Sequence, residues 1–212
     1  ERYWANDNIS QFIEEGERSK LIEELTERFE GVIDSLIIDR KNDPNSHNTG
    51  KRLAKMYINE IMSGRYESVP DTTSFPNIGE DKFNGMLVIR AEIKSICSHH
   101  HQPVTGVAYI GIIPDERVIG LSKYIRLAQW EASRGTLQES LCNSIAKSIM
   151  KATFSNNVAV YIQSQHGCCE NRGIKAHSSL TQTTVLHGEF KNSDVKKEFF
   201  DNINLQQQFA PR

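Results

Sequence analysis

The stretch that most restricts the fold is GMLVIRAEIKSIC, over residues 85–97, in which apolar and polar side chains alternate. The apolar set from Leu87 to Ile93 falls on one face, and three charged side chains fall on the other. Period-two alternation of this kind predicts a strand that is buried on one face only. VTGVAYIGIIP, over 104–114, predicts the second strand of a hairpin.

The remaining elements follow in an order that indicates the fold class. Two helices are expected after the hairpin, at about 122–133 and 136–152. NVAVYIQSQ, over 157–165, and the β-rich stretch 173–190 predict two more strands, followed by a short helix at about 193–203. The order ββααββ predicts an α+β domain in which an antiparallel four-stranded sheet carries both helices on one face.

The first part of the chain is predicted to be helical. Residues 8–39 place apolar side chains at spacings of three and four, as in an amphipathic helix. DPNSHNTG breaks this pattern, and KRLAKMYINEIMSG predicts a second helix that ends near Gly64, before a connecting segment at 65–85. We therefore expect an N-terminal helical region and linker over 1–82 and a separate domain over 83–212.

Composition excludes several classes of protein. The 212 residues carry 25 basic and 27 acidic side chains, so nothing global favours a nucleic-acid or anionic-membrane partner. No apolar run approaches the roughly 20 residues that span a bilayer. The opening ERYWANDNIS lacks signal-peptide features, and four cysteines do not make a disulfide framework. We expect a cytoplasmic protein, in which cysteine near histidine indicates metal binding or catalysis.

Cysteine and histidine gather at two distant points of the sequence. Cys97 and His100 form a C-x-x-H pair where the first strand ends, and Cys168 follows the third strand. If those strand ends meet, two thiolates and an imidazole would suit zinc and leave one coordination position open. The alternative is a polar loop with small buried cysteines. Cys142 is expected in the core, and Cys169 is left unassigned.

Basic residues gather at a second candidate site. Ser122 is predicted to cap a helix whose first turn carries Lys123 and Arg126, where free N–H groups favour an anion. The alternative is a solvated helix start. Arg172 follows Cys168 closely, and its planar guanidinium would suit a polyphosphate.

Glu139, near the start of the next predicted helix, has two possible roles. Thr136 and Glu139 fit a T-x-x-E capping box, which the spacing favours. Glu139 would otherwise be free to accept two N–H donors from the edge of a guanine.

Four motifs together resemble the GTP cyclohydrolase I family, over about residues 43–200. CSHH, GLSKYIR, TLQESL and HGCCENRG are similar to the family's C-E-H-H, G-L-S-K-x-x-R, Q-x-Q-E-R-L and H-x-C-x-x-x-R-G. Upstream, NTGKRLAKMYINEIMSG is similar to its T-P-K-R-x-A-x-M-Y segment. The resemblance implies the tunnelling fold for 83–212, as a catalytic domain. It also implies a ring-shaped homodecamer with active sites between subunits.

The resemblance also implies roles for individual residues. The zinc ligands would be Cys97, His100 and Cys168, and the acid–base groups would be His99 and His166. Guanine would be read by Gln138 and Glu139, so Glu139 would not cap the helix. The implied triphosphate contacts are Ser122, Lys123, Arg126, Arg172, Arg52 and Lys55.

The implied reaction converts GTP and water to 7,8-dihydroneopterin triphosphate and formate, the first step toward folate, other pterins or 7-deazaguanine. Three residues depart from the family pattern: Ser98 replaces a glutamate, Gly50 a proline and Ser140 an arginine. Because Ser98 replaces the glutamate, an alternative is a catalytically silent or altered-substrate relative of the family that binds zinc and nucleotide. Another tunnelling-fold enzyme, such as a nitrile reductase, is a further alternative. His100 is preferred as ligand over its neighbours because the Cys97-to-Gly106 spacing then equals the family's.

Overall fold

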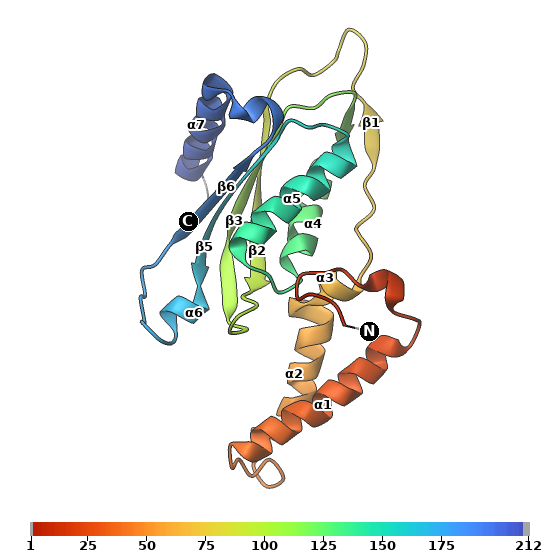
Figure 1. Cartoon of the computed structure of the whole chain (residues 1–212), viewed down its shortest axis with the longest axis vertical. Helices are drawn as coiled ribbons and strands as arrows, with labels where there is room; N and C mark the ends of the chain where they lie inside the picture. Colours follow the sequence, from red (N-terminus) through yellow and green to blue (C-terminus); the bar gives the residue numbers. More distant parts are fainter. Residues whose placement is uncertain (1, 210–212) are drawn as a thin grey trace. The chain divides into compact units, whose positions relative to one another are not determined.

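The structure is a computed structural model, and it describes residues 2–209 of the chain. The chain divides into two compact units. The first comprises residues up to Ser68 together with Ser133–Gly135, and the second comprises Val69–Ala132 and the residues from Thr136 onward. The division expected after residue 82 stays a prediction. Figure 1 shows the helices and strands of both units and labels most of them.

The first unit is helical, as predicted, but its helices have different bounds. Gly16 has a left-handed backbone (φ 85°), which glycine adopts without a steric penalty, and this residue interrupts the single helix expected over 8–39. The second predicted helix passes through a π-helical segment and ends two residues beyond Gly64. The elements are η1 (Ser10–Phe12), α1 (Glu17–Ser35), α2 (Thr49–Met56), η2 (Tyr57–Ile61) and α3 (Ser63–Tyr66).

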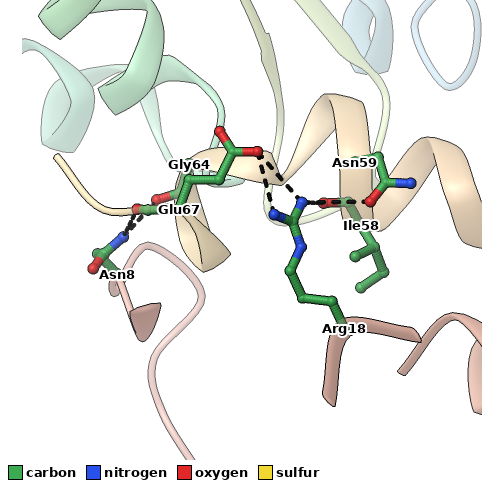
Figure 2. Close-up of polar contacts among 6 residues, drawn as sticks. All are labelled: Asn8, Arg18, Ile58, Asn59, Gly64 and Glu67. Atoms are coloured by element: carbon green, nitrogen blue, oxygen red, sulfur yellow. Dashed lines mark hydrogen bonds and ion pairs between the residues drawn. The ribbon is translucent and has the colours of Figure 1, made fainter. Parts of the chain in front are cut away.

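Two side chains join the start of this unit to its last helical turns (Figure 2). Arg18 of α1 donates to the Glu67 carboxylate at 3.3 Å and to the Ile58 carbonyl at 3.4 Å. The Asn8 amide donates to the carbonyls of Gly64, at 2.9 Å, and Glu67, at 2.7 Å. Some backbone carbonyls lack a partner within the helix in the π-helical segment and at the helix end. These side chains provide their hydrogen bonds.

The second unit contains the predicted four-stranded antiparallel sheet, in the order β2-β3-β5-β6. The last strand is shorter than the β-rich stretch suggested. Gly173 and Lys175 have positive φ values, which turn the chain, so pairing begins only at Thr181. The strands are β2 (Leu87–Ile96), β3 (Pro103–Ile112), β5 (Val158–His166) and β6 (Thr181–Leu186).

Helices cover both faces of this sheet (Figure 1). The face predicted to be buried, which carries Ile89 and Ile93, packs under α4 (Leu121–Ala132) and α5 (Gln138–Thr153), as expected. The other face packs under α7 (Ser193–Phe209), which is longer than the predicted helix at 193–203. Phe199 and Ile203 of α7 are buried there against Tyr109 and Tyr161. The alternation of β2 was therefore a correct guide to its core face.

The connecting segment holds a short strand that the sequence did not reveal. β1 (Ser74–Pro76) pairs with β4 (Arg117–Ile119) in a separate two-stranded ribbon, and η3 (Gly188–Lys191) precedes α7. None of the helices within residues 2–209 combines the length and apolar character that a membrane crossing requires.

Gly106 allows β3 and β5 to approach each other closely. It pairs with Ser164, and a Cβ atom at position 106 would lie 2.2 Å from the Gln163 carbonyl oxygen and 2.5 Å from the Ser164 Cβ. We predict that Gly106→Ala lowers the free energy of unfolding by about 1–3 kcal/mol, because backbone atoms must move. Chemical denaturation of both proteins measures the difference.

Gly31→Ala is the matched control, because a Cβ atom at this position in α1 meets nothing within 4 Å. Alanine is the better helix former, so this variant should gain about 0.5–1 kcal/mol. Equal stability of Gly106→Ala and the parent would contradict the close approach.

Candidate active site

The ends of three strands meet at one edge of the sheet. Ile96 at the end of β2 pairs with Pro103 at the start of β3. Val104 in turn pairs with His166 at the end of β5. The residues that follow β2 and β5 therefore lie at the same edge, although 71 positions separate Cys97 from Cys168.

A tight turn after β2 presents the histidines. The Cys97 amide donates to the Gln102 carbonyl at 2.9 Å, and the His101 amide donates to the Cys97 carbonyl at 2.9 Å. His101 has a positive φ of 49°, a conformation more common for histidine than for most residues. Cys97 is buried beneath the turn, whereas His99 and His100 are exposed, with ring centroids 6.3 Å apart.

A helical turn after β5 presents the second cysteine. The chain after β5 forms α6 (Gly167–Glu170), in which the Asn171 amide donates to the Gly167 carbonyl at 2.9 Å. A Cβ atom on Gly167 would lie 3.1 Å from the Pro103 carbonyl oxygen, so glycine suits this close contact. β5 ends at His166, so Cys168 lies in this helical turn and not in a continuation of the strand.

The turn and α6 together form a candidate metal centre. One ligand atom each from Cys97, His100 and Cys168 lies within 4.8 Å of the other two. Tetrahedral ligands of zinc lie about 3.5–4 Å apart, so these three side chains fit such an ion with small adjustments. Burial raises the pKa of the Cys168 thiol to about 11, and the thiols of Cys97 and Cys169 add to this rise. A raised pKa favours the protonated thiol. A bound cation would favour the thiolate instead, because cysteine binds metal ions in its deprotonated form.

Arg172 lies at the same group. Its Nη1 lies 2.9 Å from His100 Nε2, and a guanidinium can only donate, so the imidazole nitrogen accepts. The structure thus brings Arg172 together with the candidate ligands. From the sequence, Arg172 was known only to follow Cys168 closely along the chain, and its contact with His100 was not predicted.

His166 belongs to a buried hydrogen-bond network rather than to the cysteine group. Its Nε2 lies 2.7 Å from Gln138 Oε1, and Ser164 Oγ donates to the same oxygen at 2.6 Å. Burial lowers the pKa of His166, and the carboxylates of Glu139 and Glu170 act in the opposite direction. A neutral imidazole near pH 7 is therefore favoured, and it can accept a proton.

Ser164 was not anticipated from the sequence. It lies two positions before His166, so in a strand both side chains share a face. The same period-two rule that identified β2 would have found it. Thr183, which contacts Gln138 from β6, could not have been found in this way, because its position depends on the pairing of β5 with β6.

The start of α5 differs from the capping-box expectation. The helix begins at Gln138 after Leu137, and no side chain caps it. The Thr136 hydroxyl bonds to the Leu137 carbonyl instead, and Thr136 pairs through its backbone with the end of β2. Glu139 is exposed in the first turn, whereas Gln138 is buried. The capping box was therefore wrong, and the Glu139 carboxylate is available to a ligand.

The first turn of α4 lies toward the opposite end of the sheet from the candidate metal centre. Ser95 of β2 donates to the Ala132 carbonyl at 2.7 Å, so the last turn of α4 is the one near the metal centre. Ser122 is ten residues earlier, roughly 15 Å along the helix axis at 1.5 Å per residue. It is not the helix cap, because α4 begins at Leu121. Ser122 and Arg126 are exposed, and Lys123 is partly exposed.

The remaining two basic residues lie in the first unit. Arg52 and Lys55 are exposed on α2, and their assignment as phosphate contacts stays a prediction.

Known proteins are similar to this chain over most of its length. The family model described as GTP cyclohydrolase I matches residues 25–204. Proteins named GTP cyclohydrolase 1 from Flavobacterium johnsoniae and Buchnera aphidicola are 36% and 37% identical to it, each over 89% of this chain and over 84% and 85% of their own length. One from Yersinia enterocolitica is 36% identical over 88% of this chain and 82% of its own.

This match agrees with the fold. The ββααββ sheet and its two helices are the tunnelling fold that the sequence motifs implied, preceded by N-terminal helices. The chain belongs to the GTP cyclohydrolase I family.

Proposed function

We propose that this protein is a zinc-dependent GTP cyclohydrolase I, which converts GTP and water to 7,8-dihydroneopterin triphosphate and formate. The observation that carries the proposal is the convergence of Cys97, His100 and Cys168 in a member of this family. The donor set of two thiolates and one imidazole favours zinc over harder cations. With three protein ligands, Zn²⁺ would supply Lewis acidity for hydrolysis at C8 of the purine.

Two histidines are proposed to move protons. His99 is exposed beside His100 and lies outside the C-x-x-H pair, so it can reach a ligand without holding the metal. His166 is held by Gln138 at the end of β5. Opening of the imidazole ring and release of formate both require proton transfer near neutral pH, which histidine supplies.

The guanine and the triphosphate are proposed to meet charged side chains. The exposed Glu139 carboxylate can accept two N–H donors from the guanine edge. Arg172 donates to the acceptor nitrogen of His100, and metal ligation by that imidazole removes this acceptor. The guanidinium then becomes free for a phosphate oxygen. The further phosphate contacts proposed are Ser122, Lys123, Arg126, Arg52 and Lys55.

A second copy of the chain is proposed to complete the site. The first turn of α4 points away from the metal end of its own sheet, so Ser122 and Lys123 would serve the metal centre of another subunit. This arrangement supports a homo-oligomer with active sites between subunits, for which we propose a decamer. No nucleic acid or membrane is part of this function, and a cytoplasmic location is proposed.

We predict that the purified protein releases formate from GTP and holds about one zinc ion per chain, and that Cys168→Ala loses both. Loss of one thiolate leaves two ligands, too few for stable binding. Metal analysis and a formate assay measure the two properties. The product's later fate, in folate, pterin or 7-deazaguanine synthesis, is a separate question.

Cys169→Ala is the control for this prediction and should keep its zinc, because Cys169 lies outside the candidate group. Full zinc retention by Cys168→Ala would exclude that ligand. A parent that binds zinc and GTP but releases no formate would favour the silent relative suggested by Ser98.

We predict that His99→Ala and His166→Ala each lower turnover by roughly 100-fold or more while zinc content and GTP affinity stay near the parent values, as for a lost general acid or base. Steady-state assays, metal analysis and nucleotide titration of each variant provide the test. His101→Ala is the register control and should keep its zinc. Zinc loss by His99→Ala would instead make His99 the ligand.

We predict that two inactive variants restore activity when they assemble together. Lys123→Ala lacks a proposed phosphate contact and Cys168→Ala lacks a metal ligand, so a site built from two subunits would be intact in about one quarter of randomly mixed interfaces. Co-expression with two different tags isolates mixed oligomers for assay. If one chain supplied both residues, every site would carry a defect and the mixture would stay inactive.

A further inference from the structure

The Gln138 side chain is buried beneath the sheet, and the orientation of its amide is fixed. The amide nitrogen lies 3.4 Å from the Ile162 carbonyl, 3.2 Å from the Thr181 carbonyl and 3.0 Å from Thr183 Oγ1. Two of these three partners are backbone carbonyls, which can only accept. The end of the amide that faces β5 and β6 must therefore be the NH₂ group.

The amide oxygen then faces the two remaining partners. Gln138 Oε1 lies 2.6 Å from Ser164 Oγ and 2.7 Å from His166 Nε2. An amide oxygen has no hydrogen, so both partners must donate to it. Ser164 Oγ also lies 3.3 Å from His166 Nε2, but its hydrogen is directed at the shorter contact with Gln138. His166 Nε2 therefore carries a hydrogen.

From this we infer that Gln138 is a positioning residue, which keeps a hydrogen on His166 Nε2 and leaves Nδ1 as the nitrogen that exchanges a proton during the reaction. The inference rests on the proposed acid–base role of His166. It also changes the role expected for Gln138, since the amide is fully engaged with the protein and does not read guanine.

Gln138 and its neighbour Glu139 differ in burial and in the direction of their side chains. Only 4% of Gln138 is exposed, and turning its amide toward a ligand would leave the Thr181 and Ile162 carbonyls without this donor. Loss of such partners in a buried site is costly. Consecutive residues of a helix point roughly 100° apart, so Glu139 is exposed in the same turn.

Kinetics of Gln138→Met distinguish a positioning residue from a guanine contact. Methionine is close in size but offers no amide oxygen, so His166 can adopt either tautomer. We expect the turnover number to fall about 10-fold or more, with KM for GTP within about twofold of the parent value. An increase in KM with an unchanged turnover number would mean that Gln138 binds substrate and would overturn the inference.

Thr184→Val serves as the matched control. Thr184 of β6 pairs with Tyr161 of β5, and its exposed side chain lies on the opposite face of the strand from Thr183. This variant should keep the turnover number and the KM of the parent.

The tautomer can be observed without any turnover. Solid-state ¹⁵N NMR of the zinc-loaded protein labelled in histidine separates the two neutral tautomers, and His166→Ala identifies the resonances of His166. We expect protonated Nε2 and unprotonated Nδ1 in the parent, and a mixture in Gln138→Met. An Nε2 without a hydrogen in the parent would overturn the inference, even if the variant failed to fold. Absence of GTP hydrolysis with the expected tautomer would overturn only the proposed function.

Discussion

The pairing of β3 with β5 is the constraint on which the candidate site depends. Val104 pairs with His166, and this register carries the turn after β2 and the turn after β5 to the same edge of the sheet. A slip of one residue would move His166 to the other face, away from α5 and Gln138. Gly106 permits this register, because its missing side chain leaves room for Ser164, which in turn contacts Gln138 and His166. The strand register, the close packing and the proposed proton transfer therefore all depend on Gly106, Ser164 and His166.

Much of this arrangement could be predicted from local patterns. Alternation identified β2 and its core face, and the order of elements identified the four-stranded sheet with two helices. The motifs around Cys97 and Cys168 named the group of side chains that the structure brings within 4.8 Å. These features depend on residue spacing, which a sequence displays directly.

Features that depend on long-range contacts could not be predicted in the same way. The capping box at Thr136 was wrong because Leu137 holds the cap position. In addition, the Thr136 amide, which Glu139 would have to bind, already donates to the Ile96 carbonyl. The strand expected after Gly173 begins late because positive φ values turn the chain first. Gln138 fits a guanine-reading motif, yet its partners come from β5 and β6, which are 24 to 45 positions away.

The burial of Cys142 has a practical consequence for chemical labelling. Its thiol is inaccessible within α5, it donates to the Val160 carbonyl at 3.3 Å, and burial raises its pKa to about 11. Because alkylating reagents attack the thiolate, this cysteine is unreactive in the folded protein. Of the three other cysteines, Cys97 and Cys168 belong to the candidate metal centre, where the proposed zinc would shield both, and Cys169 lies beside it. The number of thiols that react under native conditions would therefore report how many chains lack the proposed zinc ion.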